Sequence, residues 1–255
     1  MKLISWNVNG VRAAAKKGFV EWLLCSAPDI LCIQETKAHE EQLDGGIRDV
    51  LGYRSFWCAG EKKGYSGVGL YSKRVPSEIS FGFGLAGEFD SEGRIIVAEY
   101  PEFTLLNIYF PNGQMNDERL RYKLGFYDAT LAFCENLRKK GRSLIICGDY
   151  NTAHGEIDLA RPDENSDVSG FLRIERDWMD KWEAHGYADT FRKLHPAAVE
   201  YSWWSMRTNA RARDVGWRLD YFYVTPDLLP KVKKAAILKD VQGSDHCPVL
   251  LEIDI

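Results

Sequence analysis

The sequence predicts an α/β protein in which β-sheets pack against each other, and three observations support this fold class. Eight short apolar or β-branched runs of strand length are distributed along the whole chain. Three amphipathic segments of helical length lie between them, which are too few for strict alternation of strands and helices. No linker, low-complexity tract or repeat divides the 255 residues, so we expect a single domain over residues 1–255.

The predicted strands are the segments in which apolar residues occur in unbroken or alternating runs of three to six. In chain order they are residues 3–6, 30–33, 68–71, 95–97, 105–110, 144–147, 219–224 and 249–253.

The predicted helices are recognised by apolar residues that recur at helical spacing. The longest runs from about Asp117 to Lys140, and Gly141 supplies its stop. Two shorter helices are expected over residues 17–25 and 174–185, the second of them ended by Gly186.

Composition and charge exclude several classes of protein. No apolar run approaches the length that spans a membrane and no secretory segment follows Met1, so we expect a cytoplasmic protein with no membrane partner. Six cysteines without a CxxC pair predict buried free thiols rather than disulfides or a zinc site. A net charge of −4 argues against coating nucleic acid through bulk positive charge, although it leaves room for a local basic face.

Familiar catalytic motifs are absent or lack their structural context. Residues 82–87 (GFGLAG) match the dinucleotide-binding pattern GxGxxG, but no helix is predicted after them, so a flexible loop is expected there. The sequence has no GxxxxGK[ST], HExxH or GxSxG, so nucleoside-triphosphate, zinc-protease and serine-hydrolase chemistry find no support.

Polar side chains follow six of the apolar runs directly. Taken singly, each is expected to be a turn former or a helix cap, but six such clusters together favour a common pocket. Its expected members are Asn7, Asn9, Glu35, Tyr109, Asn112, Asp149, Asn151, Asp220, Asp245 and His246.

A pocket with several carboxylates needs a cation to offset their charge. Oxygen ligands without cysteine favour Mg²⁺, or Mn²⁺ as a substitute, and Glu35 with Asn7 or Asn9 would suffice as an anchor. Asp149 is then free to activate a water molecule, and His246 to face a phosphate. The residues therefore predict hydrolysis of a phosphate ester.

Eight motifs together resemble the exonuclease III family of apurinic/apyrimidinic (AP) endonucleases, in the order found in that family. They are residues 5–10 (SWNVNG), 34–37 (QETK), 64–69 (GYSGVG), 109–112 (YFPN), 148–151 (GDYN), 201–204 (YSWW), 216–220 (GWRLD) and 243–246 (GSDH). The fold implied by this resemblance is a four-layer α/β sandwich, with two packed mixed β-sheets flanked by helices.

The resemblance also implies a role for each matching residue. Metal ligation falls to Glu35 with Asn7 and Asn9, and to Asp245 as a second ligand or as an orienter of His246. Contact with the scissile phosphate falls to Tyr109, Asn112, Asn151 and His246, with Asp220 holding the imidazole. Asp149 activates the water or protonates the leaving oxygen.

The substrate-binding residues implied by the resemblance lie mainly in residues 201–219. Trp203, Trp217 and Leu219 would wall a pocket that accepts a sugar without its base, and at least one of Trp203 and Trp204 is expected in the core. Four arginines there, Arg207, Arg211, Arg213 and Arg218, give a local charge of +3 that would meet phosphates. The remaining expected substrate contacts are Tyr65, and Met115 and Arg207 near the lesion.

The implied activity is Mg²⁺-dependent cleavage of double-stranded DNA 5′ of abasic sites, with 3′-phosphodiesterase and 3′→5′ exonuclease activity. The expected partner is DNA with abasic or 3′-blocked sites, bound by a monomer associated with the nucleoid of a microbial cell. Two alternatives remain open at this point. One is a related phosphodiesterase or phosphatase, and the other is a protein that binds DNA lesions without turnover.

Overall fold

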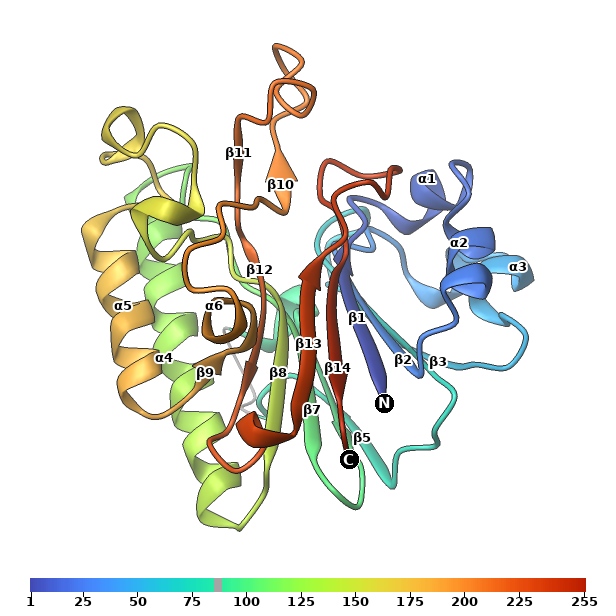
Figure 1. The fold of residues 1–255 in the computed structure, drawn as a ribbon. Helices are drawn as coiled ribbons and strands as arrows, with labels where there is room; N and C mark the ends of the chain where they lie inside the picture. The colour runs from blue at the N-terminus through green and yellow to red at the C-terminus, as the bar shows by residue number, and fades with distance from the viewer. Residues whose placement is uncertain (85–88) are drawn as a thin grey trace.

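Two six-stranded mixed β-sheets pack face to face with helices on their outer sides, so that the molecule has four layers (Figure 1). The computed structural model describes residues 1–84 and 89–255. The loop expected over residues 82–87 lies partly outside these described residues. The predicted α/β sandwich is confirmed.

The first sheet is built around two parallel strands, β1 (Lys2–Asn7) and β2 (Ile30–Gln34). Every other neighbouring pair in it is antiparallel. Its spatial order is β13 (Val232–Ile237), β14 (Val249–Ile253), β1, β2, β4 (Val68–Ser72) and β3 (Arg54–Cys58).

The second sheet repeats this plan around the parallel strands β7 (Thr104–Tyr109) and β8 (Leu144–Asp149). Its order is β5 (Glu78–Phe81), β6 (Ile95–Glu99), β7, β8, β12 (Asp220–Val224) and β9 (Ala188–Asp189). A two-stranded ribbon of β10 (Trp203–Trp204) and β11 (Gly216–Trp217) projects beyond the sheets at the top of Figure 1.

The helices cover the two outer faces. On the first sheet lie α1 (Val11–Ala15), α2 (Phe19–Ser26) and α3 (Gly45–Arg48), and on the second α4 (Asp117–Lys139) and α5 (Arg173–Ala184), while α6 (Thr190–Leu194) follows β9 (Figure 1). Asn116 begins α4 by accepting a hydrogen bond from the backbone N–H of Arg119. The three predicted helices are confirmed to within two residues at each end, and the short α1, α3 and α6 were not predicted.

Alternation along the strands decides which side chains face the other sheet. In β1, Leu3 belongs to the core between the sheets, whereas Ile4 and Trp6 pack under the helices. In β8, Ile145 and Cys147 face the first sheet. The residues that continue these inner rows at the strand ends are polar, so polar groups meet where the seam between the sheets opens.

A chain of buried amides crosses the seam below that opening. Nε2 of Gln34 in β2 donates hydrogen bonds to Oγ of Ser5 and to Oδ1 of Asn107 in β7, at 2.9 and 2.8 Å. Nδ2 of Asn107 in turn donates to the backbone carbonyls of Ile33 and Gly69 in the first sheet. The two sheets are therefore joined by directional bonds as well as by apolar packing.

The cysteines are all free thiols, as predicted. The expected burial is confirmed for Cys32, Cys134, Cys147 and Cys247 and is wrong for Cys25, which is exposed at the end of α2, while Cys58 is partly buried. Over residues 1–84 and 89–255, no helix is both long enough and apolar enough to cross a membrane.

Candidate active site

The polar ends of several strands meet at one edge of the sandwich. Asn7 ends β1 in the first sheet. Tyr109 ends β7 and Asp149 ends β8 in the second sheet, and these two strands are parallel, so their last residues lie side by side. Asp220 begins β12, which is antiparallel to β8, and it pairs directly with Asp149. His246 lies just before β14 and completes the group.

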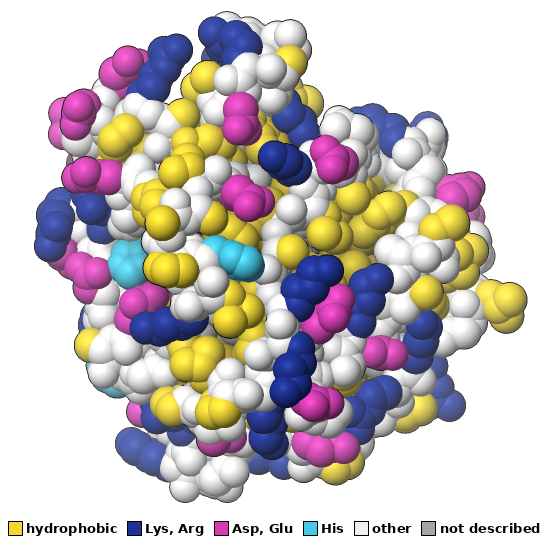
Figure 2. All heavy atoms as spheres, in the orientation of Figure 1, with side chains coloured by type: hydrophobic (Ala, Val, Ile, Leu, Met, Phe, Trp, Pro, Cys, Tyr) yellow, Lys and Arg dark blue, Asp and Glu magenta, His cyan; other side chains and the backbone are white. Residues whose placement is uncertain are grey.

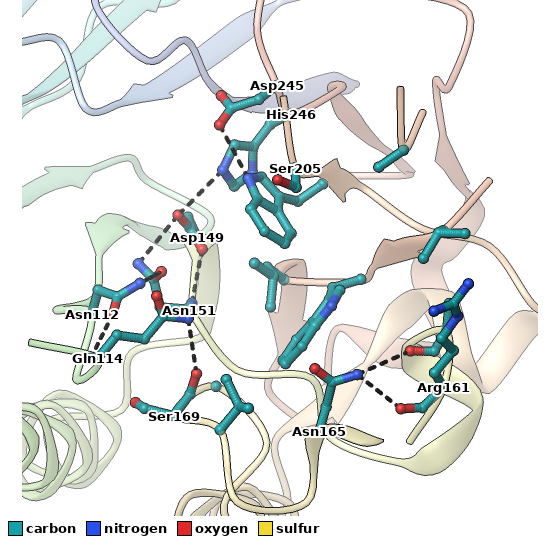
Figure 3. A pocket seen from close by; sticks show the side chains of 18 of the residues that line it. Asn112, Gln114, Asp149, Asn151, Arg161, Asn165, Ser169, Ser205, Asp245 and His246 are labelled. Atoms are coloured by element: carbon teal, nitrogen blue, oxygen red, sulfur yellow. Dashed lines mark hydrogen bonds and ion pairs between the residues drawn. The ribbon is translucent and has the colours of Figure 1, made fainter. Parts of the chain in front are cut away.

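His246 lies between two buried carboxylates. Its Nδ1 is 2.8 Å from Oδ2 of Asp220, and its Nε2 is 3.8 Å from Oδ2 of Asp149. The same Oδ2 of Asp220 accepts a hydrogen bond from Oγ of Ser202. Figure 3 shows Asp149 and His246 pointing toward one another across the upper part of a pocket. The imidazole is thus held by Asp220, with its free edge turned toward Asp149.

Burial and charge set the protonation of this group. Burial raises the pKa of Asp149 to about 7, and the neighbouring Asp220 adds to the rise, while His246 opposes it. For His246, burial favours the neutral form, but the charges of Asp220 and Asp149 outweigh it and raise the pKa to about 10. At neutral pH the imidazole is therefore a cationic donor beside a carboxyl poised to exchange a proton.

Asn151 lies next to this pair in a left-handed turn, with φ 51°. Its backbone N–H donates to Oδ1 of Asp149, and its Nδ2 donates to the carbonyl of Phe110, at 2.8 and 2.9 Å. Nδ2 of Asn112 donates to Oδ1 of Asn151 (Figure 3). Tyr109 lines the same pocket.

The carboxylate of Glu35 faces the same opening from the first sheet. Nδ2 of Asn7 donates to Oε2 of Glu35 and to Oδ2 of Asp149, at 3.0 and 2.8 Å, so one amide spans two carboxylates. Glu35 and Asn9 both have a positive φ, 56° and 45°, which turns the chain sharply after β2 and β1. These turns bring the two side chains to the edge of the pocket.

Glu35, Asn9 and Asp245 offer oxygen ligands of the kind that a hard divalent cation prefers. Nζ of Lys37 lies 2.9 Å from Oε1 of Glu35 and donates a hydrogen bond to Oδ1 of Asn9, so a positive charge already stands at these oxygens. Asp245 stays ionised despite its burial, because His246 and hydrogen bonds from Asn9 and Trp203 lower its pKa. The residues present therefore fit a divalent metal ion.

A second group with the geometry for a metal ion is Asp149, Asp220 and His246, whose ligand atoms lie within 4.8 Å of one another. Within this group, however, Nδ1 of His246 is already hydrogen-bonded to Oδ2 of Asp220 at 2.8 Å. The oxygen ligands around Glu35 are the better candidates.

A pocket of about 540 Å³ opens beside Asp149 and His246. Trp203, Trp217 and Leu219 line it, and so does the segment after β8, through Arg161, Asn165 and Ser169 (Figure 3). Nε1 of Trp203 donates to Oδ2 of Asp245 at 3.1 Å, so a wall residue also holds a carboxylate of the polar group. Its neighbour Trp204 is buried in the core, which confirms that at least one of the two tryptophans belongs there.

Three of the expected substrate contacts lie away from this pocket. The hydroxyl of Tyr65 accepts hydrogen bonds from Arg94 and Arg119, so its ring is part of an arginine cluster. Met115 is 82% exposed just before α4, and Arg207 lies on the surface of the ribbon between β10 and β11. Met115 and Arg207 are thus exposed, whereas Tyr65 is partly buried.

The expected basic patch is smaller than the sequence implied. Arg218 is buried and forms ion pairs with Asp158 and Asp189 at 2.8 and 2.7 Å, so the inclusion of Arg218 among phosphate contacts is wrong. The guanidinium of Arg211 donates hydrogen bonds to the backbone carbonyls of Ser244, Lys239 and Val241, so these N–H groups are already used. Arg207 and Arg213 remain exposed on the projecting ribbon, and basic side chains appear at its tip in Figure 2.

Two basic residues near the site were missed. Arg94 donates to the carbonyl of Tyr109 at 2.8 Å, and its guanidinium lies 4.6 Å from the centre of the Tyr109 ring. Lys123 is fully buried under the Asn151 turn. The sequence held one weak signal for Lys123, which falls on the apolar face of the predicted helix, at helical spacing from Leu120 and Tyr127.

Comparison with known proteins identifies the group to which this architecture belongs. The model of the endonuclease/exonuclease/phosphatase family matches residues 4–246. The chain belongs to this family. It is 42% identical to an exodeoxyribonuclease of Bacillus subtilis, with all of both chains covered. It is 41% identical to the DNA repair nuclease APEX1 of Danio rerio, over 98% of this chain and 81% of the relative.

A solved AP endonuclease structure from Archaeoglobus fulgidus has the same fold. It superposes with a TM-score of 0.88 at 30% identity, and all of both chains is covered. The resemblance inferred from the eight motifs is thereby confirmed, and the family relatives are nucleases that hydrolyse DNA.

Proposed function

We propose that this protein is a Mg²⁺-dependent AP endonuclease that cuts double-stranded DNA 5′ of an abasic site and leaves a 3′-hydroxyl. The observation that carries the proposal is that a pair of residues suited to hydrolysis lies next to a pocket. The Asp149 and His246 pair, suited to phosphate hydrolysis, borders directly on an aromatic pocket with room for a small group. The 3′-phosphodiesterase and 3′→5′ exonuclease activities would use the same residues on a strand end.

Glu35, Asn9 and Asp245 would hold the metal ion, with Asn7 fixing the Glu35 carboxylate. When bound, Mg²⁺ supplies positive charge that offsets the phosphate and polarises it for attack. Mn²⁺ would serve as a substitute, because it prefers the same oxygen ligands.

The proton steps fall to this chain's own residues. Asp149 in its ionised form takes a proton from a water molecule that attacks phosphorus, and Asn151 orients that water. His246, kept cationic by Asp220, donates a hydrogen bond through Nε2 to a phosphate oxygen, and Tyr109 and Asn112 hold the other oxygens. The bond from phosphorus to O3′ breaks, and O3′ takes up the proton that Asp149 removed from the water, which returns Asp149 to its ionised form.

The pocket supplies the selectivity. A sugar without a base, turned out of the helix, would fit against Trp203, Trp217 and Leu219, whereas an attached base would collide with these rings. Met115 and Arg207 would touch the duplex beside the lesion, and Tyr65 would act through the arginine cluster around it. The rest of the proposal is a single catalytic domain over residues 1–255, acting as a monomer in the cytoplasm at the nucleoid.

A gel assay on matched labelled duplexes tests this function. Abasic, nicked, 3′-blocked and uracil-containing duplexes are incubated with Mg²⁺ or with chelator. We expect a cut 5′ of the abasic site in Mg²⁺ alone. An intact abasic duplex, together with hydrolysis of a phosphoinositide, a lipid or poly(A), would identify a related phosphodiesterase instead. Tight binding of the abasic duplex without cleavage would identify a lesion-binding protein.

A further inference from the structure

A buried lysine lies beneath the turn that carries Asn151. Lys123 projects from α4, and its ammonium group is fully buried. Nζ donates to the backbone carbonyl of Asn151 at 2.8 Å, to Oγ1 of Thr152 at 2.9 Å and to Oε1 of Glu175 at 2.6 Å. All three donors of the ammonium group are therefore used, and two of them hold the turn after β8.

The partner carboxylate holds a second loop. Glu175 in the first turn of α5 is also fully buried, and its Oε2 accepts the backbone N–H groups of Gly170 and Leu172 at 2.6 and 3.0 Å. Its Oε1 accepts a hydrogen bond from Oγ of Ser169. One carboxylate thus fixes the loop that leads into α5.

These two loops form adjoining parts of the candidate site. The N–H of Ala153 donates to the carbonyl of Gly170 at 2.8 Å, which joins the loops directly. Gly170 has a φ of 103°, and a Cβ there would lie 3.2 Å from both the carbonyl oxygen of Asn151 and the Trp217 ring. The position of the Gly170 loop therefore decides how Trp217 sits beside Asn151.

The pair is a poor device for stability alone. Burial lowers the pKa of Lys123, and Glu175 only opposes this effect, so the charges carry a desolvation cost. Apolar residues of similar volume in such places are often equally stabilising or more so. Apolar residues would not hold the carbonyl of Asn151 and the N–H groups of Gly170 and Leu172 in one arrangement.

We propose that the buried Lys123–Glu175 pair is a positioning device that ties the phosphate-binding turn of Asn151 to the wall of the abasic-sugar pocket. The pair fixes the pocket wall that selects the substrate relative to Asn151, which takes part in the hydrolytic step. This inference rests on the proposed function, because it assigns the pocket to a sugar without a base.

The test compares two activities of Lys123→Met. We measure kcat/KM for cutting an abasic duplex and for removing an intact 3′ nucleotide, and take their ratio. A variant that is partly unfolded loses both activities by the same factor, so its ratio is unchanged. Displacement of the pocket wall affects the abasic substrate more, and we expect the ratio to fall about tenfold.

Lys181→Met is the matched control. Nζ of Lys181 on α5 lies 2.8 Å from Oδ1 of Asp128 on α4, so this exposed pair joins the same two helices away from the site. Its ratio should equal that of the wild type. If Lys123→Met does not fold, Glu175→Gln, which keeps one oxygen acceptor, takes its place, and the same fall in ratio is expected.

The outcomes separate the two proposals. A wild-type protein that does not cut abasic DNA would overturn the proposed function itself. An active wild type combined with an unchanged ratio in the variant that folds, Lys123→Met or Glu175→Gln in its place, would overturn the positioning role and leave the proposed function intact.

Discussion

Oδ2 of Asp220 lies 2.8 Å from Nδ1 of His246, and this contact turns the other ring nitrogen toward Asp149. Asp149→Asn and His246→Ala should each lower kcat by a factor of about 10² to 10⁴, because each removes a group that acts on a proton or on charge in the transition state. Steady-state kinetics and DNA-binding titrations would show a much smaller change in affinity. His185→Ala, at the exposed end of α5, is the control. Equal losses in binding and turnover would contradict these roles.

The pH profile should reflect the two raised pKa values. Asp149 must be ionised to accept a proton, so kcat should rise as the pH increases through about 7. His246 must keep its proton, so kcat should fall again as the pH approaches about 10. Asp220→Asn removes the charge that holds this proton and should move the alkaline limb to lower pH. Activity that declines through pH 7 would instead identify Asp149 as the acid that protonates the leaving oxygen.

Stability at low pH should depend on Asp158. Although burial opposes it, pairing with Arg218 lowers the pKa of Asp158 to about 2, below its ordinary value of 3.8. The stabilisation, about 2 kcal/mol, is fully present above pH 4 and is lost as the pH falls through about 2. Urea unfolding should find Asp158→Asn less stable than the wild type by that amount at pH 6. The difference should shrink below pH 4, and a difference independent of pH would rule out the charged pair as its source.

Trp217 should determine selectivity more than turnover. Trp217→Ala enlarges the pocket beside Gly170, so nucleotides that carry a base should be accepted more readily. We expect the preference for abasic over intact substrates to fall about tenfold in paired kcat/KM measurements. An unaltered preference would mean that the ring packs as core and does not touch the sugar.

Metal binding should depend on Glu35. Glu35→Ala removes the carboxylate that faces Lys37 and Asn7, and calorimetric titration with Mn²⁺ should show binding weakened at least tenfold. The exposed Glu41→Ala nearby should bind Mn²⁺ as the wild type does. Chelator should abolish DNA cleavage by the wild type. Cleavage that survives chelator would contradict a metal-dependent reaction.

The strands that the sequence predicted are those buried by both neighbouring layers. β1, β2, β7 and β8 read as continuous apolar runs for that reason. The missed strands include all four sheet edges, β3, β5, β9 and β13. An edge strand such as β13 carries exposed Lys233 and Lys234 among its apolar residues, so its pattern is weak.

The convergence of polar residues could be predicted because it follows from where the apolar runs end. The ion-pair partners of individual residues could not be predicted. Asn7 and Asp149 directly follow apolar runs that read as buried strands, so their meeting place could be inferred from the strands alone. Arg218 was misplaced because its partners Asp158 and Asp189 are distant in sequence, and nothing local to Arg218 indicates an ion pair. The ion pair of Lys123 and Glu175 could not be predicted for the same reason.

The amide chain of Gln34 and Asn107 has a mechanical consequence for the site. Glu35 and Asn7 belong to one sheet and Asp149 to the other, so any sliding of the sheets past each other would pull the two halves of the site apart. Apolar packing resists separation but is tolerant of sliding, because it has no preferred direction. The hydrogen bonds that join Asn107 to Gln34 and to the backbone carbonyls of Ile33 and Gly69 resist shear. They therefore fix the position of one sheet relative to the other, next to Glu35, Asn7 and Asp149, whose alignment the reaction requires.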